Sequence, residues 1–114
     1  MAGRDVVKVP YSKMDLAILE TMVRAGYLRS AQRKGRGAKR IIAVELRYDE
    51  NRRPAINDIK FISLPSRKIY RGYRELRRSK QGYGHYFLST PQGIMTEVEA
   101  KEKKVGGQVL FEIW

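Results

Sequence analysis

The last third of the chain, residues 82–114, limits the fold more than any other stretch because it sets several structural signals in a fixed order. An apolar run at 85–88 leads into a polar run at 89–93, which predicts a strand followed by a tight turn. The hydroxyl side chains of this turn suit a ligand held by hydrogen bonds. A second alternating segment at 108–114 predicts a closing strand with three core side chains on one face, Val109, Phe111 and Ile113.

A short helix is predicted between these two strands. Thr96 is followed three positions later by Glu99, which is the spacing of a capping box, in which each side chain bonds the other residue's backbone N–H. The helix should run to about Lys104, and Gly106 should end it. Strands on both sides of a short helix indicate an α+β fold.

Composition narrows the class of protein. The 114 residues suffice for one domain or two very small ones. A net charge of +12, with tyrosine and arginine interleaved, favours a nucleic-acid partner. The chain has no cysteine and one histidine, which excludes disulfides and the usual Cys/His zinc sites. No apolar run approaches the ~20 residues of a membrane span and no secretory signal is evident, so we expect a cytosolic protein.

The first half begins with strand and helix signals. An alternating segment at 5–10 ends at a proline and predicts a short strand. Ser12 is placed to cap a helix, and Asp15 provides an acidic side chain in its first turn. Gly26 should end this helix. Its apolar stripe, which should face the core, consists of Met14, Ala17, Ile18, Leu19 and Met22.

A loop and a hairpin are predicted next. Residues 30–40 contain five basic residues, two glycines and no acid, which predicts a flexible basic loop that is either solvated or in contact with RNA backbone. Its glycines lack the spacing of a phosphate-binding loop. Alternation at 41–48 predicts a strand, a turn follows at 49–54, and 56–62 should return as the partner strand.

A boundary is predicted at 63–66, where proline and serines separate two periodic segments. We therefore expect an N-terminal α+β subdomain at 1–64 and a C-terminal, mainly antiparallel β subdomain at 65–114. The second opens with a run at 67–76 in which basic and aromatic residues alternate like those of a strand. Seven of residues 67–80 are basic and one is acidic, so this segment is either a solvated loop or a surface for phosphates and stacked bases.

Three groups of residues share their spacing with one known family. The C-terminal group reads Gly84-x-x-Phe87-Leu88-Ser89-Thr90-x-x-Gly93-Ile94-Met95-Thr96, then Glu99-Ala100-Lys101 and Lys103-Lys104-Val105-Gly106-Gly107. The middle group reads Ile62-Ser63-x-Pro65 and Ile69-Tyr70-x-Gly72-Tyr73-x-Glu75-Leu76, and the first reads Val9-Pro10-Tyr11-Ser12-Lys13. Together they cover nearly the whole chain and closely resemble ribosomal protein S8 of the bacterial small subunit.

The resemblance implies a structural constituent of the cytoplasmic small ribosomal subunit that supports subunit assembly. It would bind a stem in the central domain of small-subunit ribosomal RNA, mainly through its C-terminal half, beside neighbouring small-subunit proteins. Lysines and arginines would supply phosphate affinity, and the Ser89–Thr90 turn would bond 2′-hydroxyls and base edges. The RNA-binding residues predicted in this way are Ser12, Lys13, Arg67, Lys68, Tyr70, Arg71, Ser89, Thr90, Gln92, Gly93, Lys104 and Glu112.

Glu112 has two open interpretations. It either faces the RNA from the last strand and accepts a hydrogen bond from a base amino group, or it is exposed to solvent.

The chain departs from the family pattern in three places. Pro91 stands where the family usually has a third turn serine, so one hydroxyl and one backbone donor are lost. The segment 85–87, His-Tyr-Phe, replaces smaller aliphatic residues, which predicts a repacked or more exposed strand. The family normally opens with an amphipathic helix, whereas only Met1–Arg4 precede the first predicted strand here, so part of the N-terminal sheet should be left for RNA, a neighbour or a loop to cover.

Other functions are less well supported by the residues. A translational repressor would bind its own mRNA through the same surface, which sequence cannot separate from the ribosomal role. An enzyme would need converging acid and base groups, yet His85 has no obvious partner and Glu97, Glu99 and Glu102 resemble a solvated helix face. We expect no catalysis, cofactor or metal. Membrane attachment would need a basic amphipathic helix, and the helix after Ser12 is too balanced in charge.

Overall fold

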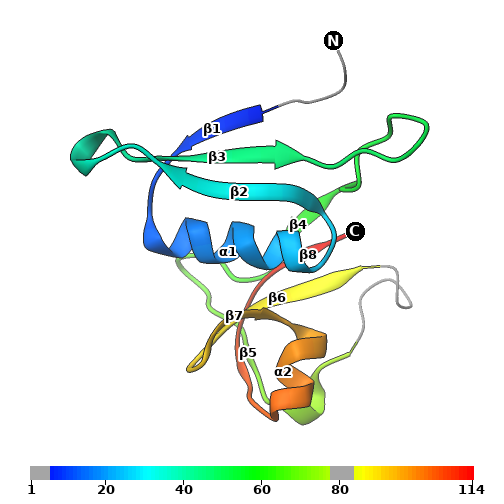
Figure 1. Cartoon of the computed structure of the whole chain (residues 1–114). Coiled ribbons are helices and arrows are strands. Elements are labelled where there is room, and N and C mark those ends of the chain that lie inside the picture. The colour runs from blue at the N-terminus through cyan, green and yellow to red at the C-terminus, as the bar shows by residue number, and fades with distance from the viewer. Residues whose placement is uncertain (1–5, 78–83) are drawn as a thin grey trace. The chain divides into compact units, whose positions relative to one another are not determined.

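The computed structural model covers all 114 residues, and the structure describes residues 6–77 and 84–114. They form two compact units, Met1–Ala55 (unit 1) and Ile56–Trp114 (unit 2), each of which is considered by itself. Figure 1 traces the elements along the chain. The helices and antiparallel sheets confirm the predicted α+β class.

Unit 1 is a three-stranded antiparallel sheet with one long helix. β1 (Val6–Pro10) and β2 (Leu28–Lys34) both pair with β3 (Ile41–Leu46), which lies between them. α1 (Lys13–Arg24) connects the two edge strands, which is the order of a split β-α-β unit. The Ser12 cap is confirmed, because Ser12 Oγ accepts a hydrogen bond from the N–H of Asp15 at 3.0 Å.

The apolar stripe of α1 is buried only towards the end of the helix. Met22 is 7% exposed, whereas Met14 in the first turn is 53% exposed, so the prediction that Met14 belongs to the core is wrong. The chain folds back after α1, where the N–H of Tyr27 donates to the carbonyl of Met22 and both Tyr27 and Leu28 are buried. This fold-back covers the last turn of α1.

The predicted flexible loop at 30–40 is instead ordered structure. Residues 30–34 belong to β2, and a single 3₁₀ turn, η1 (Gly37–Lys39), leads into β3. Gly35 has φ +92°, and a Cβ there would lie 2.6 Å from the carbonyl oxygen of Lys39, so the turn requires glycine. The prediction failed because pairing with β3 satisfies the backbone of a segment whose side chains are mostly basic.

The predicted hairpin of 41–48 with 56–62 is also wrong. β3 is the central strand of its sheet, with β1 on one edge and β2 on the other, so no edge is left for a further strand. β4 (Ile59–Phe61) pairs with β8 (Gly107–Ile113) instead. This pairing places residues 56–64 in unit 2, so the compact units divide after Ala55.

Unit 2 is a five-stranded sheet built around β8. β6 (His85–Thr90) pairs along one edge of β8 and continues into β7 (Gly93–Thr96), a strand that the sequence pattern did not predict. β4 and β5 (Tyr70–Arg71) follow one another along the other edge. The predicted strand at 67–76 is therefore reduced to β5, after which η2 (Tyr73–Glu75) is a 3₁₀ turn.

An irregularity in β8 changes which side chains share a face. Phe87 is opposite Phe111 and Leu88 is opposite Val109, so Leu110 is an extra residue that β6 does not match. Because directly opposed residues lie on one face, Val109 and Phe111 face opposite sides of the sheet. The prediction that Val109, Phe111 and Ile113 share one face is thus wrong for Val109. All three are nevertheless buried.

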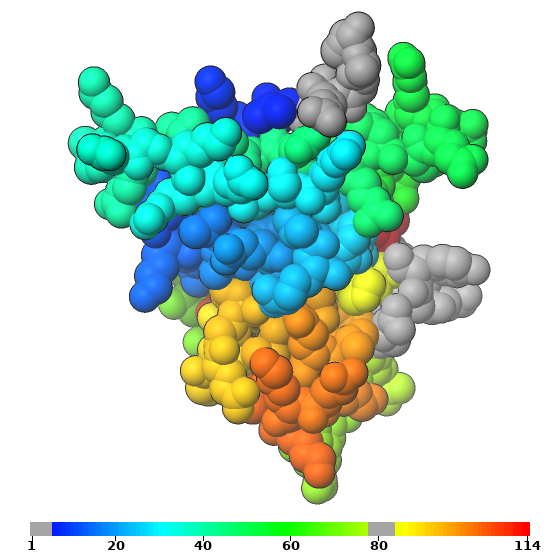
Figure 2. All heavy atoms as spheres, viewed as in Figure 1, coloured from blue at the N-terminus to red at the C-terminus, as the bar shows by residue number. Residues whose placement is uncertain are grey.

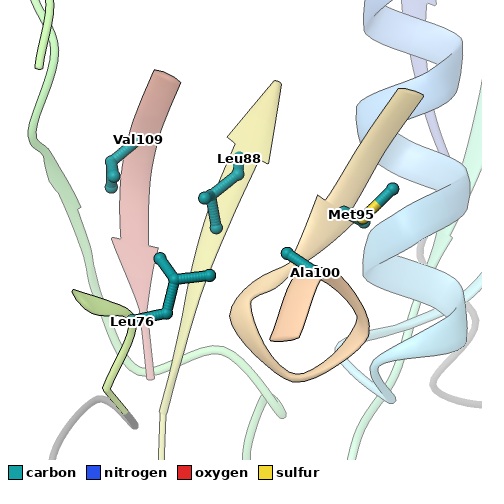
Figure 3. Close-up of a cluster of buried hydrophobic side chains, with 5 residues drawn as sticks. All are labelled: Leu76, Leu88, Met95, Ala100 and Val109. Atoms are coloured by element: carbon teal, nitrogen blue, oxygen red, sulfur yellow. The ribbon is translucent and has the colours of Figure 1, made fainter. Parts of the chain in front are cut away.

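Val109 belongs to the buried cluster between the sheet and α2 (Glu97–Lys103). Figure 3 shows its five buried side chains, which converge from β8, β6, β7, α2 and the segment after η2: Val109, Leu88, Met95, Ala100 and Leu76. The predicted capping box is confirmed, since Thr96 Oγ1 accepts from the N–H of Glu99 and Glu99 Oε1 accepts from the N–H of Thr96. The predicted end near Lys104 is confirmed, since the helix ends at Lys103. The residue that stops it is Lys104, in the left-handed region at φ 55°, and not Gly106.

The two glycines after α2 let β8 enter between its neighbours. A Cβ at Gly106 would overlap the backbone of Arg71 and Gly72, and one at Gly107 would overlap the carbonyl of Ser89. Both obstacles are backbone atoms of paired strands, which cannot move as a flexible side chain can. The glycines therefore determine how closely β5, β8 and β6 approach one another.

We predict that Gly107→Ala lowers the free energy of unfolding by about 1–3 kcal/mol, because the methyl group would push β8 away from β6. Gly72→Ala is the matched control, since a Cβ there would be 3.5 Å from only the flexible carboxylate of Glu75. It should change stability by less than about 0.5 kcal/mol. Urea denaturation of both variants tests this, and equal midpoints would contradict the close approach.

Candidate nucleic-acid interface

Four side chains from four strands form one row on the face of unit 2's sheet that is opposite α2. Tyr70 on β5 is opposite Gln108 on β8, Gln108 is opposite Ser89 on β6, and Ser89 is opposite Ile94 on β7. Opposed residues share a face, so this Ser89 row crosses the strands perpendicular to their direction. Tyr70 is 62% exposed, and the other three are half-buried. The row combines an aromatic ring, an amide and a hydroxyl.

The two predicted hydroxyls have different surroundings. Thr90 Oγ1 donates to the carbonyl of Gly93 at 2.8 Å and accepts from the N–H of Gln92 at 3.1 Å, so it holds the turn together. No hydrogen bond to Ser89 Oγ is formed within the part of the chain that the structure describes. Ser89 is half-buried and its hydroxyl is left for a ligand to bond, whereas the Thr90 hydroxyl is used inside the turn.

The turn between β6 and β7 is short and exposed. Ser89 and Thr90 end β6, so only Pro91 and Gln92 lie between the two strands, and both are exposed. Gly93 adopts φ +117°, a backbone conformation that favours glycine. Proline fixes its own φ and the Thr90 hydroxyl fixes the next amide, so the Ser89 hydroxyl is held at a rigid strand end.

The predicted cations of unit 2 are all exposed. Leu64 and Arg67 close a tight turn by exchanging backbone hydrogen bonds of 2.9 and 3.0 Å, and Lys68 follows it. Arg67 and Lys68 are both exposed. Ser63 ties this turn to β8, because its Oγ donates to the carbonyl of Val109 and accepts from the N–H of Ile69. Arg71 is also exposed, and its guanidinium donates to the carbonyl of Tyr70 at 3.0 Å. Lys104 is exposed at the end of α2.

Glu112 lies on the other face of the sheet. It is 7% exposed and opposite Tyr86 on β6, on the side of the buried Leu88 and Val109. The Tyr86 hydroxyl is hydrogen-bonded to Glu112, and Tyr86's pKa is raised above 10.0 by burial and by the negative charges of Glu112 and Glu97. Glu112 is neither solvent-exposed nor on the face of the Ser89 row. We therefore leave it out of the candidate surface.

Glu97 likewise corrects the expectation of a solvated acidic helix face. It is 1% exposed, and its Oε1 accepts from the N–H of Tyr86 at 2.9 Å. Glu99 is half-buried and caps α2, so only Glu102 is exposed on this helix in the predicted manner. These acids anchor β6 and the helix start.

The predicted contacts of unit 1 are at the start of α1. Ser12 is half-buried and occupied as the helix cap, and Lys13 is exposed. Sequence analysis missed the aromatic residue beside them. The Tyr11 ring lies under two guanidinium groups, with Arg40 at 4.6 Å and Arg33 at 5.8 Å from its centre. In Figure 2 the segment around η1 projects at the outer margin of unit 1, so this basic segment is at the surface.

Within residues 6–77 and 84–114, no group of three His, Asp or Glu side chains is close enough to hold a metal ion. His85 lies on β6 opposite Ile113, in a sheet rather than in a pocket of acids and bases. None of the described helices is long and apolar enough to cross a membrane. The Ser89 hydroxyl, the Tyr70 ring and the cations are groups that bind RNA backbone and base edges.

Comparison with known proteins agrees with this chemistry. The family described as "Ribosomal protein S8" matches residues 1–114. A small ribosomal subunit protein uS8 of Nautilia profundicola is 40% identical over 114 residues, which is all of this chain and 87% of that protein. The uS8 proteins of Nitratiruptor sp. and Borreliella burgdorferi are 42% and 39% identical over 98% of this chain, and the matches cover 86% and 85% of their own lengths.

We predict that Tyr86→Phe lowers the free energy of unfolding at pH 7 by about 1–2 kcal/mol, because the buried Glu112 loses a hydrogen-bond donor. The raised pKa means that the contribution of Tyr86 is fully present below about pH 10 and is lost as pH rises through its folded-state pKa. The difference between the two proteins should thus shrink in alkali.

Urea denaturation at pH 7 and at a series of alkaline pH values measures this difference. Tyr73→Phe is the control, since its hydroxyl accepts from the exposed Arg74 at 3.2 Å. That change should cost less than about 0.5 kcal/mol. A difference for Tyr86→Phe that stays constant with pH would argue against the coupling to Glu112.

Proposed function

Because this chain belongs to the ribosomal protein S8 family, we propose that it binds a stem in the central domain of small-subunit ribosomal RNA through the Ser89 row. The family is structural and non-enzymatic, and it belongs to the small ribosomal subunit of the cytoplasm. The recognition surface lies within residues 65–114. Neighbouring small-subunit proteins are the other expected partners.

One observation carries this proposal: Ser89, whose hydroxyl has no hydrogen bond within the described residues, ends a strand beside a rigid turn, in one row with an exposed ring and an amide. The minor groove of an RNA helix is wide and shallow and displays 2′-hydroxyls and base edges. Ser89 is short and Gln108 is half-buried, so this part of the sheet can approach such a groove, whereas long exposed side chains would hold it away. In this arrangement Ser89 and Gln108 bond the groove, and Tyr70 contacts sugar or base at its margin.

The cations contribute attraction rather than recognition. Arg67, Lys68 and Arg71 are exposed on the segment that borders the row, and Lys104 follows α2. Contacts with phosphates release counterions and make affinity depend on salt without reading the sequence. Ser12 and Lys13 would add contacts from unit 1.

A second RNA could use the same surface. The row reads groove shape and hydroxyl positions more than base identity, so a stem in the protein's own mRNA with the same groove would fit it. In that case the protein would also repress its own translation. Competition between the two RNA fragments for one protein distinguishes a shared site from separate sites.

We predict that Ser89→Ala reduces the preference for a central-domain stem over a scrambled stem by about tenfold, as expected for loss of one well-placed hydrogen bond of about 1.5 kcal/mol. The slope of affinity against salt should be unchanged, because no phosphate contact is lost. Ser30→Ala is the matched control, since that hydroxyl donates to Glu45 in unit 1. A salt titration of each variant with both RNAs measures both quantities.

Thr90→Ala separates recognition from rigidity. It removes the hydroxyl that closes the turn, so we expect a smaller loss of preference together with faster amide exchange at Gln92. Equal binding of both stems by the unmodified protein would refute the proposed function. Unchanged preference in Ser89→Ala would refute only the assignment to this row.

A further inference from the structure

An aromatic side chain outside the Ser89 row is exposed on the same sheet. Phe61, on β4, is 68% exposed, the largest exposed fraction among the large apolar side chains of the described residues. Its strand is the edge of the sheet, paired with β8 alone among the described strands. Ile59, two residues earlier on the same face of β4, is 39% exposed as well. Neighbouring exposed apolar side chains of this kind are typical of surfaces that bind a partner.

The Phe61 ring is held in a defined orientation. It meets Phe111 edge-on, with ring centres 6.2 Å apart and planes at 68°, and Phe111 stacks on Phe87 at 4.8 Å. Phe87 is fully buried. The backbone is fixed on both sides of β4, where the N–H of Ile62 donates to Leu110 and that of Asp58 donates to Trp114. The exposed ring therefore loses little freedom when a ligand binds.

Phe61 and the Ser89 row share a face. Phe61 is opposite Phe111, Phe111 is opposite Phe87, and Phe87 is two residues before Ser89 on β6. Phe61 and Tyr70 both lie along the other edge of β8, opposite Phe111 and Gln108. These two β8 residues are three positions apart, which at about 3.3 Å per residue is roughly 10 Å. A ligand that covers the Ser89 row can thus reach Phe61 without leaving this face.

Charge indicates which ligand this surface fits. Residues 59–71, which carry both exposed rings, contain four basic residues and no acidic one: Lys60, Arg67, Lys68 and Arg71. All four are exposed, and three of them flank Tyr70 in the sequence. Lys60 is opposite Glu112 and therefore lies on the other face of β4 from Phe61. An exposed ring with a basic border is the arrangement with which proteins bind single-stranded nucleic acid, because cations follow the backbone and the ring stacks on a base.

We propose that Phe61 is a stacking residue for an unpaired base of the bound RNA, next to the helical stem that the Ser89 row contacts. This inference rests on the proposed function and extends the surface from a paired stem to a flanking unpaired nucleotide. A protein segment is the other conceivable occupant of an apolar edge strand. The basic border and the three-residue length of β4 favour the RNA over an added strand.

The test uses the full chain with Phe61→Ala, Phe61→Leu and Phe61→Trp. Affinity is measured for a central-domain RNA fragment that retains its unpaired nucleotides and for its fully paired stem alone. Loss of a stacked base should weaken binding of the fragment with unpaired nucleotides by about tenfold in the Ala and Leu variants. The Trp variant keeps an aromatic face and should retain the original affinity. All variants should bind the paired stem equally.

The Leu variant is decisive because it keeps apolar bulk but removes the aromatic face. Leu64→Ala is the matched control. Leu64 is an apolar side chain three residues after Phe61 and is 50% exposed, and its removal should not change the affinity for either RNA. Ultraviolet cross-linking of the unmodified complex should attach a nucleotide to the peptide that contains Phe61. Full binding by Phe61→Leu, or by Phe61→Ala, would overturn stacking and leave an apolar contact suited to protein. Equal binding of a central-domain stem and a scrambled stem by the unmodified protein would refute the proposed function itself, whatever the Phe61 variants do.

Discussion

The close backbone approach at Gly106 and Gly107 is the constraint on which unit 2 depends. Without side chains there, β8 enters between β5 and β6 and becomes the strand with which β4, β5 and β6 all pair. The same approach aligns Tyr70, Gln108 and Ser89 in one row. Gly106 and Gly107 have no side chains to contact RNA, yet they position the groups that would contact it.

The unmatched residue Leu110 determines which side chains of β8 lie on each face of the sheet. Beyond it, Glu112 and Tyr86 are on the face that also carries Leu88 and Val109, while Phe111 and Phe61 are on the opposite face. One face is thereby committed to packing with α2 and to a buried tyrosine–carboxylate contact. The other face carries the buried Phe87 and Phe111 together with the exposed Phe61 and Tyr70. Its exposed part, beside exposed cations, is what a polyanion can reach.

Sequence analysis succeeded where the determinants are local. The Ser12 cap and the Thr96–Glu99 box depend on spacings of three residues, and both formed. It failed where the determinants are distant in the sequence. The partner of β4 depends on which sheet edge is free. The face on which Val109 lies depends on one unmatched residue in β8. Phe61 was missed because its exposure follows from its position at a sheet edge, which no periodicity of residues 59–61 reveals.

The central claim is that RNA covers the face of the Ser89 row and not the face of α2. The chain has no cysteine, so a single one can be introduced on each side, as Tyr70→Cys or as Glu102→Cys on exposed α2. The measurement is the rate of maleimide labelling with and without the central-domain RNA fragment. The account predicts that RNA slows labelling at 70 and leaves 102 unchanged. Protection at 102 alone, or equal protection at both, would contradict it.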